Sequence, residues 1–178
     1  MAEAPFALWL PPPPPVAARL QQLIERLAAE FGGVPFPPHM TLFGRVDLDP
    51  GEARRRTSRL VRQWADEPEP VVLHATGFGF HDAFYRALFL PIATPAPLWR
   101  AYRLASAIFA GVAEDLAPFL PHLSLAYTDA PIATRLAVVR QLAAEDGVPD
   151  VSFTVDRLCL IRAAGGPADW SVEAEFEL

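Results

Sequence analysis

Two short stretches of this 178-residue chain bring together residue types that can handle a phosphate group. Residues 35–42 read Pro-Phe-Pro-Pro-His-Met-Thr-Leu, and residues 118–125 read Pro-Phe-Leu-Pro-His-Leu-Ser-Leu. Five of the eight positions are identical, and a sixth exchanges one hydroxyl amino acid for the other. A lone His-x-Thr tripeptide arises easily by chance, but a duplicate inside an eight-residue match indicates a repeated unit with a shared site.

A pair of histidines is suited to phosphodiester chemistry. In-line displacement at phosphorus needs a base on the attacking oxygen and an acid on the leaving oxygen, on opposite sides of the phosphorus atom. Imidazole can fill either role near neutral pH, because its unperturbed pKa is about 6.5. We therefore predict that His39 and His122 form this pair, although the residues do not say which is base and which is acid. Thr41 and Ser124 are predicted to donate hydrogen bonds to the non-bridging oxygens as negative charge develops there.

The other candidate groups have structural explanations. Two histidines on separate strands, without a nearby carboxylate pattern, make a weak zinc site, so we expect neither a metal nor a cofactor. Cys159 lies in an apolar run and is expected to be a buried small hydrophobe. His74 and His81 stand outside the repeat and are expected in a strand and a turn. The arginine run 54–56 is predicted to lie on a solvated helix face.

The repeat also predicts how the two motifs are positioned. Side chains alternate along a strand, so His39 and Thr41 share one face while Met40 and Leu42 fill the other, and the second motif repeats this arrangement. A duplication of short antiparallel pieces tends to fold about a pseudo-two-fold axis. The two polar faces would then meet across a cleft.

Hydrophobic periodicity predicts an α+β fold along the whole chain. Apolar residues recur every three or four positions between residues 16 and 31, directly after the prolines 11–15, which predicts an amphipathic helix. Strands are expected at 6–10, 38–46, 71–78, 85–90, 122–127, 151–161 and 171–176, and helices at 16–31, 51–64, 98–111 and 132–144. We expect one domain over residues 1–178, with two pseudo-symmetric lobes, each an antiparallel sheet with helices on its outer face, and an active-site cleft between them.

Composition and charge exclude several classes of function. The chain is 52% hydrophobic and carries a net charge of −6, so it lacks the basic footprint of a protein that grips long nucleic acid. A mononucleotide or a short RNA end is the better expectation. All fifteen basic residues are arginines. Because the chain has no lysine, it cannot be an enzyme that forms a Schiff base through lysine, a P-loop protein with the Gly-Lys motif, or a ligase that forms a lysine–nucleotide intermediate.

The first residues and the apolar runs bear on location. An acidic residue stands near the start, where a signal peptide would carry positive charge, and prolines interrupt the apolar stretch that follows. No apolar run approaches the roughly 20 residues needed to span a bilayer. We therefore expect a cytoplasmic protein without a membrane partner, and a monomer.

The chain resembles the two-histidine (2H) phosphoesterase superfamily, whose signature is a pair of His-x-(Thr/Ser)-x motifs on facing lobes. Within it, the chain is similar to the cyclic phosphodiesterase branch, which opens cyclic phosphates on ribose, including the ADP-ribose 1″,2″-cyclic phosphate left by tRNA splicing. The narrower likeness rests on Leu-Trp-Leu-Pro at residues 8–11, on the Pro-Phe-x-Pro-His lead, and on the tyrosine that closes the second motif. It covers nearly the whole chain, but only the histidine motifs are specific.

The resemblance implies that one histidine activates water while the other protonates the departing ribose oxygen, giving a phosphomonoester. It also implies a role for Tyr127 at the phosphate. Counting by twos places Tyr127 on the face opposite His122, so it joins the site only if the strand bends or ends there. Trp9 and Phe84 are candidate platforms for a base, since stacking is worth roughly 1 to 3 kcal/mol per base, although burial is the commoner fate of such side chains.

Three alternatives stay open at this point. Another branch of the superfamily acts on RNA ends, either on a 2′,3′-cyclic phosphate or in 2′-5′ RNA ligation. A module could instead hold a nucleotide without turning it over, and a duplication could be structural, with no phosphate site. Both motifs are complete here, hydroxyls included, which favours catalysis.

Overall fold

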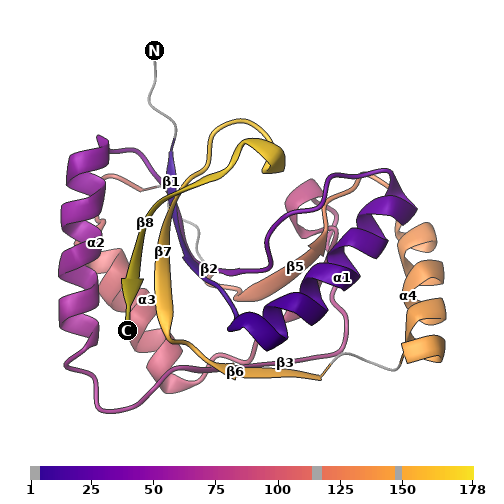
Figure 1. Ribbon diagram of the computed structural model, residues 1–178, viewed down its shortest axis with the longest axis horizontal. Coiled ribbons are helices and arrows are strands. Elements are labelled where there is room, and N and C mark those ends of the chain that lie inside the picture. Colours follow the sequence, from indigo (N-terminus) through magenta and orange to yellow (C-terminus); the bar gives the residue numbers. More distant parts are fainter. Residues whose placement is uncertain (1–4, 114–117, 147–149) are drawn as a thin grey trace.

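The predicted α+β class is confirmed by the computed structural model, which describes residues 5–113, 118–146 and 150–178 (Figure 1). Every neighbouring pair of strands in its two sheets is antiparallel. The larger sheet has the order β4 (Leu88–Pro91), β5 (His122–Ala126), β2 (Met40–Val46), β1 (Phe6–Leu10), β7 (Arg157–Arg162) and β8 (Ser171–Glu177). A smaller sheet pairs β3 (Val72–Thr76) with β6 (Asp150–Thr154).

The duplicated phrase belongs to two strand–helix–strand units, β1–α1–β2 and β4–α3–β5. Helix α1 spans Pro14–Phe31, and α3 spans Ala96–Ile108. The two units meet at the centre of the larger sheet, where Met40 of β2 lies opposite Leu123 of β5. Each helix packs on the other unit's strand, α1 on β5 and α3 on β2. This exchange is what an approximate two-fold axis between β2 and β5 produces.

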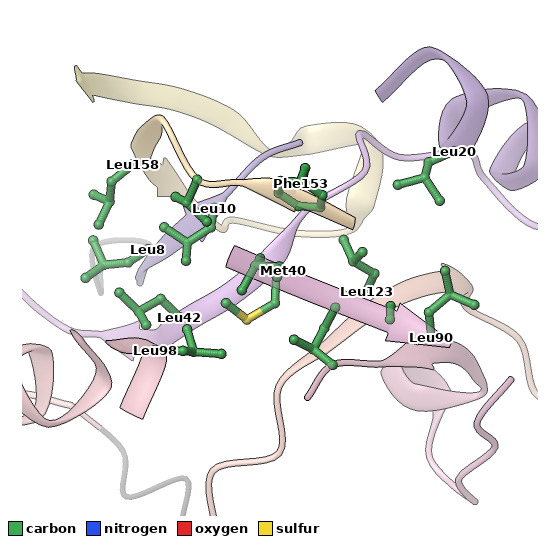
Figure 2. Packing of buried hydrophobic residues seen from close by; sticks show 14 of the residues in the cluster. Leu8, Leu10, Leu20, Met40, Leu42, Leu90, Leu98, Leu123, Phe153 and Leu158 are labelled. Carbon is green, nitrogen blue, oxygen red and sulfur yellow. The ribbon is translucent and has the colours of Figure 1, made fainter. Parts of the chain in front are cut away.

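One face of the larger sheet is the core. Met40 and Leu42 are 0% and 1% exposed, as the alternation along β2 predicts, and Leu123 and Leu125 are buried in the same way on β5. Figure 2 shows this layer, with leucines from both repeats around the Met40 side chain. The residues labelled there are Leu8, Leu10, Leu20, Met40, Leu42, Leu90, Leu98, Leu123, Phe153 and Leu158. The motif histidines and hydroxyls are left for the opposite face.

That opposite face has a small cluster of its own. Ala7, Trp9, Cys159 and Ile161 are buried together, with Trp170 packed against them. Cys159 is 6% exposed, which confirms the packing prediction, and burial raises the pKa of its thiol to about 11. The thiol therefore stays protonated at neutral pH.

The remaining helices lie at the two sides of the molecule (Figure 1). Helix α2 (Pro50–Trp64) packs on α3 and on the two last strands, and α4 (Ile132–Asp146) follows β5. The arginine run 54–56 lies in α2 and pairs with Glu52 and Glu173, so it is the surface feature that was predicted. His74 lies in β3, and His81 is exposed ahead of a short 3-10 helix.

The structure corrects two expected strands. The segment 151–161 forms two strands in different sheets, because the chain crosses between sheets at Val155 and Asp156, whose backbone groups bond to Val71 and Leu178. The strand expected at 85–90 starts only at Leu88, since the residues before it form the 3-10 helix Phe84–Arg86.

Proline explains why helices begin earlier than the apolar pattern indicates. Helix α1 starts at Pro14 rather than at Val16, and α3 starts at Ala96 rather than at Leu98. Proline is favoured in the first helical turn, because the N–H group that it lacks would have no hydrogen-bond acceptor within the helix. Among the residues that the structure describes, none of the helices combines the length and the apolar character needed to cross a membrane.

Candidate active site

A pocket of about 370 Å³ lies where β2 and β5 meet, on the face opposite the core. Six of the seven candidate residues line it: Trp9, His39, Thr41, His122, Ser124 and Tyr127. The seventh, Phe84, does not line the pocket and is 39% exposed. Its neighbour Tyr85 lines the pocket in its place, because successive side chains of the 3-10 helix point in different directions. The two copies of the repeat therefore contribute to one site.

Both motif histidines have the same tautomer, fixed by the backbone. His39 Nδ1 lies 2.7 Å from the carbonyl oxygen of Pro37, and His122 Nδ1 lies 2.8 Å from that of Leu120. A carbonyl oxygen only accepts, so each Nδ1 must carry a proton and donate it. Pro37 and Leu120 each precede a proline, which favours the extended backbone at these two positions. In both rings Nε2 is therefore the nitrogen available to exchange a proton with a ligand.

His39 is deeply buried beneath an aromatic ring. The imidazole is 5% exposed and stacks on Trp9, with ring centroids 3.4 Å apart and planes 5° apart. Trp9 lies opposite Thr41 in the β1–β2 pairing, which places the indole over the imidazole. Burial, with a smaller contribution from the charge of nearby His122, lowers the pKa of His39 to about 4, although the hydrogen bond to Pro37 opposes the shift. His39 is therefore neutral at physiological pH.

Because one face of the Trp9 indole is stacked on His39, that face is not available to stack on a nucleobase. Trp9 is only 7% exposed. It is therefore buried, which the sequence analysis gave as the more common outcome for such a side chain. An edge contact from Trp170, 5.5 Å away between ring centroids, further encloses the indole.

His122 has a more open environment. Its side chain is half-buried, and the edge of Phe89 approaches it with a centroid distance of 5.2 Å and an interplanar angle of 63°. Burial lowers the pKa of His122, and the positive charge of Arg86 lowers it further, while the hydrogen bond to Leu120 opposes both. Phe89 lies opposite Ser124 as Trp9 lies opposite Thr41, so it is the pseudo-symmetric counterpart of Trp9.

Tyr127 enters the pocket because β5 ends at Ala126, which releases the next residue from the strand alternation. Its ring stacks on Phe36 with centroids 4.0 Å apart. Its hydroxyl is hydrogen-bonded to the side chain of Ser124, and burial raises the pKa of Tyr127 above its ordinary value. Ser124 Oγ also lies 3.3 Å from the carbonyl oxygen of Tyr85, to which it donates. Tyr127 is thus a neutral hydroxyl beside a motif hydroxyl.

Sequence reasoning missed several side chains that line the pocket, and four of them are Arg45, Tyr85, Arg86 and Trp170. Arg45 could have been found, because it follows His39 and Thr41 at intervals of two on the same face of β2. It is also the described non-glycine residue with a positive φ, 51°. The other three come from connections outside the repeat, where no periodicity marks them.

The pocket has the charge pattern of an anion site. None of the residues lining it, all of which are described, is an aspartate or a glutamate, although the chain has 21 of them. Arg45 and Arg86 supply cations, and the histidines and hydroxyls supply hydrogen-bond donors. Across the described residues, no three His, Cys, Asp or Glu side chains are grouped to hold a metal ion. A phosphate fits this lining.

An antiparallel sheet that presents two His-x-(Thr/Ser) motifs to one pocket, one from each repeated unit, defines a two-histidine phosphoesterase fold. Residues 12–167 match the model of the 2′-5′ RNA ligase superfamily, and the chain belongs to that superfamily. The resemblance drawn from the two motifs is thereby confirmed.

Individual relatives agree with this assignment. The chain is 24% identical over 158 residues to a cyclic phosphodiesterase of Arabidopsis thaliana, covering 88% of this chain and 84% of the relative. Its fold is similar to that of TT0787 of Thermus thermophilus, with a TM-score of 0.67, 20% identity and coverage of 98% and 97% of the two chains. It is also similar to E. coli LigT complexed with 3′-AMP, with a TM-score of 0.60, 16% identity and 98% coverage of both.

Proposed function

We propose that this protein is a phosphodiesterase that hydrolyses a small cyclic phosphate on ribose to a phosphomonoester, without a metal, by two-histidine acid/base catalysis. The proposed substrates are ADP-ribose 1″,2″-cyclic phosphate and nucleoside 2′,3′-cyclic phosphates. One observation carries this function: two imidazoles with the same tautomer line one pocket that contains no carboxylate. Both Nε2 atoms are then free to exchange protons, and the proposed mechanism has them act on opposite sides of a bound phosphorus atom.

The different environments of the histidines divide the roles between them. His39 is neutral because it is buried against Trp9, so its Nε2 takes the proton from the attacking water. The water oxygen forms a bond to phosphorus while the bond to one ribose oxygen breaks, and His122 gives its Nε2 proton to that oxygen. A bound phosphate favours the protonated form of His122, because an opposite charge nearby raises a histidine pKa.

Three hydroxyls are the proposed ligands of the non-bridging oxygens. Thr41 and Ser124 line the pocket two residues after each histidine, and Tyr127 bonds to Ser124. Negative charge grows on the non-bridging oxygens as the water attacks, so hydroxyl protons directed at these oxygens stabilise the transition state more than the ground state. The Ser124 hydroxyl would turn from the carbonyl of Tyr85 to the phosphate when the substrate binds.

The size of the pocket supports a small substrate. A volume of about 370 Å³ lies at the lower end of the range that accommodates small ligands and cofactors, about 300 to 1,000 Å³. The net charge of −6 does not suit a long polyanion. A relative is named a cyclic phosphodiesterase, and a similar fold was solved with 3′-AMP, a ligand of mononucleotide size.

A panel of substrates tests this function. Wild type, His39→Ala and His122→Ala are incubated with EDTA and ADP-ribose 1″,2″-cyclic phosphate, a nucleoside 2′,3′-cyclic phosphate or an RNA oligomer with a 2′,3′-cyclic end, and products are identified by phosphorus NMR. We expect turnover of a small substrate that both substitutions abolish. Activity on the oligomer alone would move the protein to the RNA-end enzymes. Binding without any turnover would make it a nucleotide-binding module.

An aromatic shelf at one edge of the pocket favours RNA ends as the second candidate substrate. Tyr102 and Phe119 line the pocket and stack with centroids 4.0 Å apart, and Trp99 stacks on Tyr102 while remaining 43% exposed. An exposed ring of this kind can stack on a second nucleobase. If RNA ends are the substrate, Trp99→Ala should lower kcat/KM for the oligomer about tenfold and leave a mononucleotide unaffected. Equal effects on both would remove this candidate.

A further inference from the structure

We propose that Arg86 binds the phosphate in the pocket and that the buried Arg135 is the positioning residue that holds the Arg86 loop in place. The inference deepens the proposed function, since it rests on the pocket being a phosphate site. Both arginines lie outside the duplicated motifs, so neither has a counterpart in the motif of the other half.

Arg86 is placed and equipped for an anion. It lines the pocket with both histidines and Ser124, and its charge reaches His122, whose pKa it helps to lower. Within residues 5–113, 118–146 and 150–178, no carboxylate pairs with its guanidinium. Among the described residues, ion pairs with carboxylates are formed by Arg26, Arg54, Arg55, Arg56, Arg100, Arg157 and Arg162. The Arg86 guanidinium therefore keeps its donors for a ligand.

Phosphate is the anion that matches this group. A guanidinium is a planar fork that can give two parallel hydrogen bonds to two oxygens of one phosphate, and such bonds are about twice as strong as neutral ones. The hydroxyls of Thr41 and Ser124 line the same pocket, so Arg86 would complete a ring of donors around the non-bridging oxygens.

Arg135 holds the loop that carries Arg86. It lies in α4, is only 4% exposed, and its hydrogen bonds to described residues all go to backbone carbonyls. Its Nε lies 2.9 Å from the oxygen of Ala130, and its Nη1 lies 2.9 Å from the oxygen of His81 and 2.5 Å from that of Ala87. His81 and Ala87 stand at the two ends of the segment that contains the 3-10 helix.

The other restraints on the loop are ring contacts of Tyr85 with Tyr127 and Trp170 and a few hydrogen bonds. Within it, the Arg86 N–H donates to Ala83 and the His81 N–H donates to Arg86, while Ser124 reaches the carbonyl of Tyr85. A buried charge is costly unless its donors are bonded, and here carbonyl dipoles satisfy it in place of a carboxylate. Nη1 bonds to both ends of the loop while Nε of the same planar fork bonds to Ala130, and a lysine, with a single nitrogen, cannot reproduce this arrangement of three bonds. Removing the fork at Arg135 should therefore let Arg86 move away from His122.

The first test measures phosphate binding without any turnover. Inorganic phosphate is titrated into wild type, Arg86→Gln, Arg86→Lys and the control Arg59→Gln, an exposed arginine of α2 outside the pocket, while the imidazole resonances are followed by NMR. We expect Arg86→Gln to weaken phosphate binding about 10- to 100-fold, Arg86→Lys to weaken it less, and Arg59→Gln to leave it unchanged. Unchanged binding in Arg86→Gln, or no binding of phosphate by wild type, would overturn the proposal.

The second test asks whether Arg135 acts through Arg86. The pKa of His122 should rise in Arg86→Gln, because a nearby positive charge is removed, and should rise in the same direction in Arg135→Gln and Arg135→Lys. In the Arg86→Gln background, the Arg135 substitution should add no further shift. A loss of stability with an unmoved His122 pKa would reduce Arg135 to an ordinary structural residue; if Arg135→Gln does not fold, Arg135→Lys carries the measurement.

The two tests separate this inference from the proposed function. A wild type that binds phosphate through Arg86 but hydrolyses no cyclic phosphate would sustain the phosphate site and refute the enzyme. Hydrolysis that is unaffected in Arg86→Gln would sustain the enzyme and refute Arg86 as a phosphate ligand.

Discussion

The two halves of the site share their geometry and differ in their surroundings. In each half, a histidine Nδ1 donates to the carbonyl two residues earlier, and a hydroxyl follows two residues later. An aromatic ring lies opposite that hydroxyl on the neighbouring strand, Trp9 in one half and Phe89 in the other. Yet Trp9 stacks flat on His39, whereas Phe89 meets His122 with its edge.

In the proposed mechanism, this difference lets a symmetric scaffold perform an asymmetric reaction. Hydrolysis needs one neutral and one protonated imidazole at the start, and two equivalent histidines would have no means of dividing these states. The duplicated backbone sets the tautomer and the direction of both rings. What differs between the halves is the environment of each ring: His39 is deeply buried under the flat indole of Trp9, whereas His122 is half-buried, in T-shaped contact with Phe89 and near the charge of Arg86.

Removing either imidazole should have the largest effect. We expect His39→Ala and His122→Ala each to lower kcat by about 10² to 10⁴-fold, the usual contribution of a general acid or base. The controls are His74→Ala and His81→Ala, which alter exposed histidines outside the pocket. Steady-state hydrolysis with circular dichroism of each variant measures this. A variant that folds and keeps its rate would remove that half from the mechanism.

Removing the hydroxyls tests whether the halves contribute equally to charge stabilisation. Thr41→Val and Ser124→Ala should each lower kcat by about 10²-fold, the lower range for losing one donor to a developing oxyanion. Ser124 also bonds to Tyr127, so Tyr127→Phe should reproduce part of the Ser124 effect and none of the Thr41 effect. The comparison is made on kcat, because a ground-state role would appear in KM instead.

The buried histidine should leave a mark on stability as a function of pH. His39 has a pKa of about 4 in the folded protein, against about 6.5 unfolded. Below pH 6.5 the unfolded chain therefore binds a proton that the folded protein refuses, and stability falls until the pH reaches about 4. The difference corresponds to roughly 3 kcal/mol in the free energy of unfolding.

Urea unfolding between pH 7 and pH 4 isolates this contribution. Wild type should lose more stability across this range than His39→Gln, because the variant lacks the titrating group. His122→Gln should remove a smaller part of the loss, since His122 is only half-buried. Equal effects of the two substitutions would mean that the halves are electrostatically equivalent.

The contrast between the halves also shows how far the sequence leads. The fold class and the shared pocket of His39, Thr41, His122 and Ser124 follow from the repeat, because a duplicated strand motif carries its own alternation. The break between β6 and β7 at Val155 and Asp156 was not predicted, because the apolar residues continue through it and the partners of its backbone groups, Val71 and Leu178, are far away in the sequence.

The residues that distinguish the halves were the hardest to find. Trp9 was a candidate as a nucleobase platform, and only the β1–β2 register places it on His39. Arg86 and Trp170 reach the pocket from connecting segments whose course depends on contacts with residues distant in the sequence, such as the bonds from Arg135 to the carbonyls of His81 and Ala87. The repeat therefore predicted the motif residues that the two halves share. Arg86 and Trp170, which make the halves different, come from connecting segments that are not repeated.

A methyl group added behind Phe89 should disturb one half alone. Gly79 pairs with Phe89 through two backbone hydrogen bonds, and a Cβ atom at Gly79 would lie 2.4 Å from Cε2 of the Phe89 ring. Gly79→Ala must therefore displace the Phe89 ring from its T-shaped contact with His122. We expect kcat to fall about tenfold, as small misplacements at a reacting group do, with the His122 resonances shifted and those of His39 unmoved.

A compensating substitution separates ring displacement from damage to the backbone. Phe89→Val in the Gly79→Ala background leaves room for the methyl group, so the fold and the β4–β5 pairing should recover while the edge contact with His122 stays absent. If that double variant regains wild-type activity, Phe89 is only a filler of space; if its rate stays about tenfold low, the edge contact orients His122. The second outcome would mean that each half needs its own aromatic partner, flat for the base and edge-on for the acid.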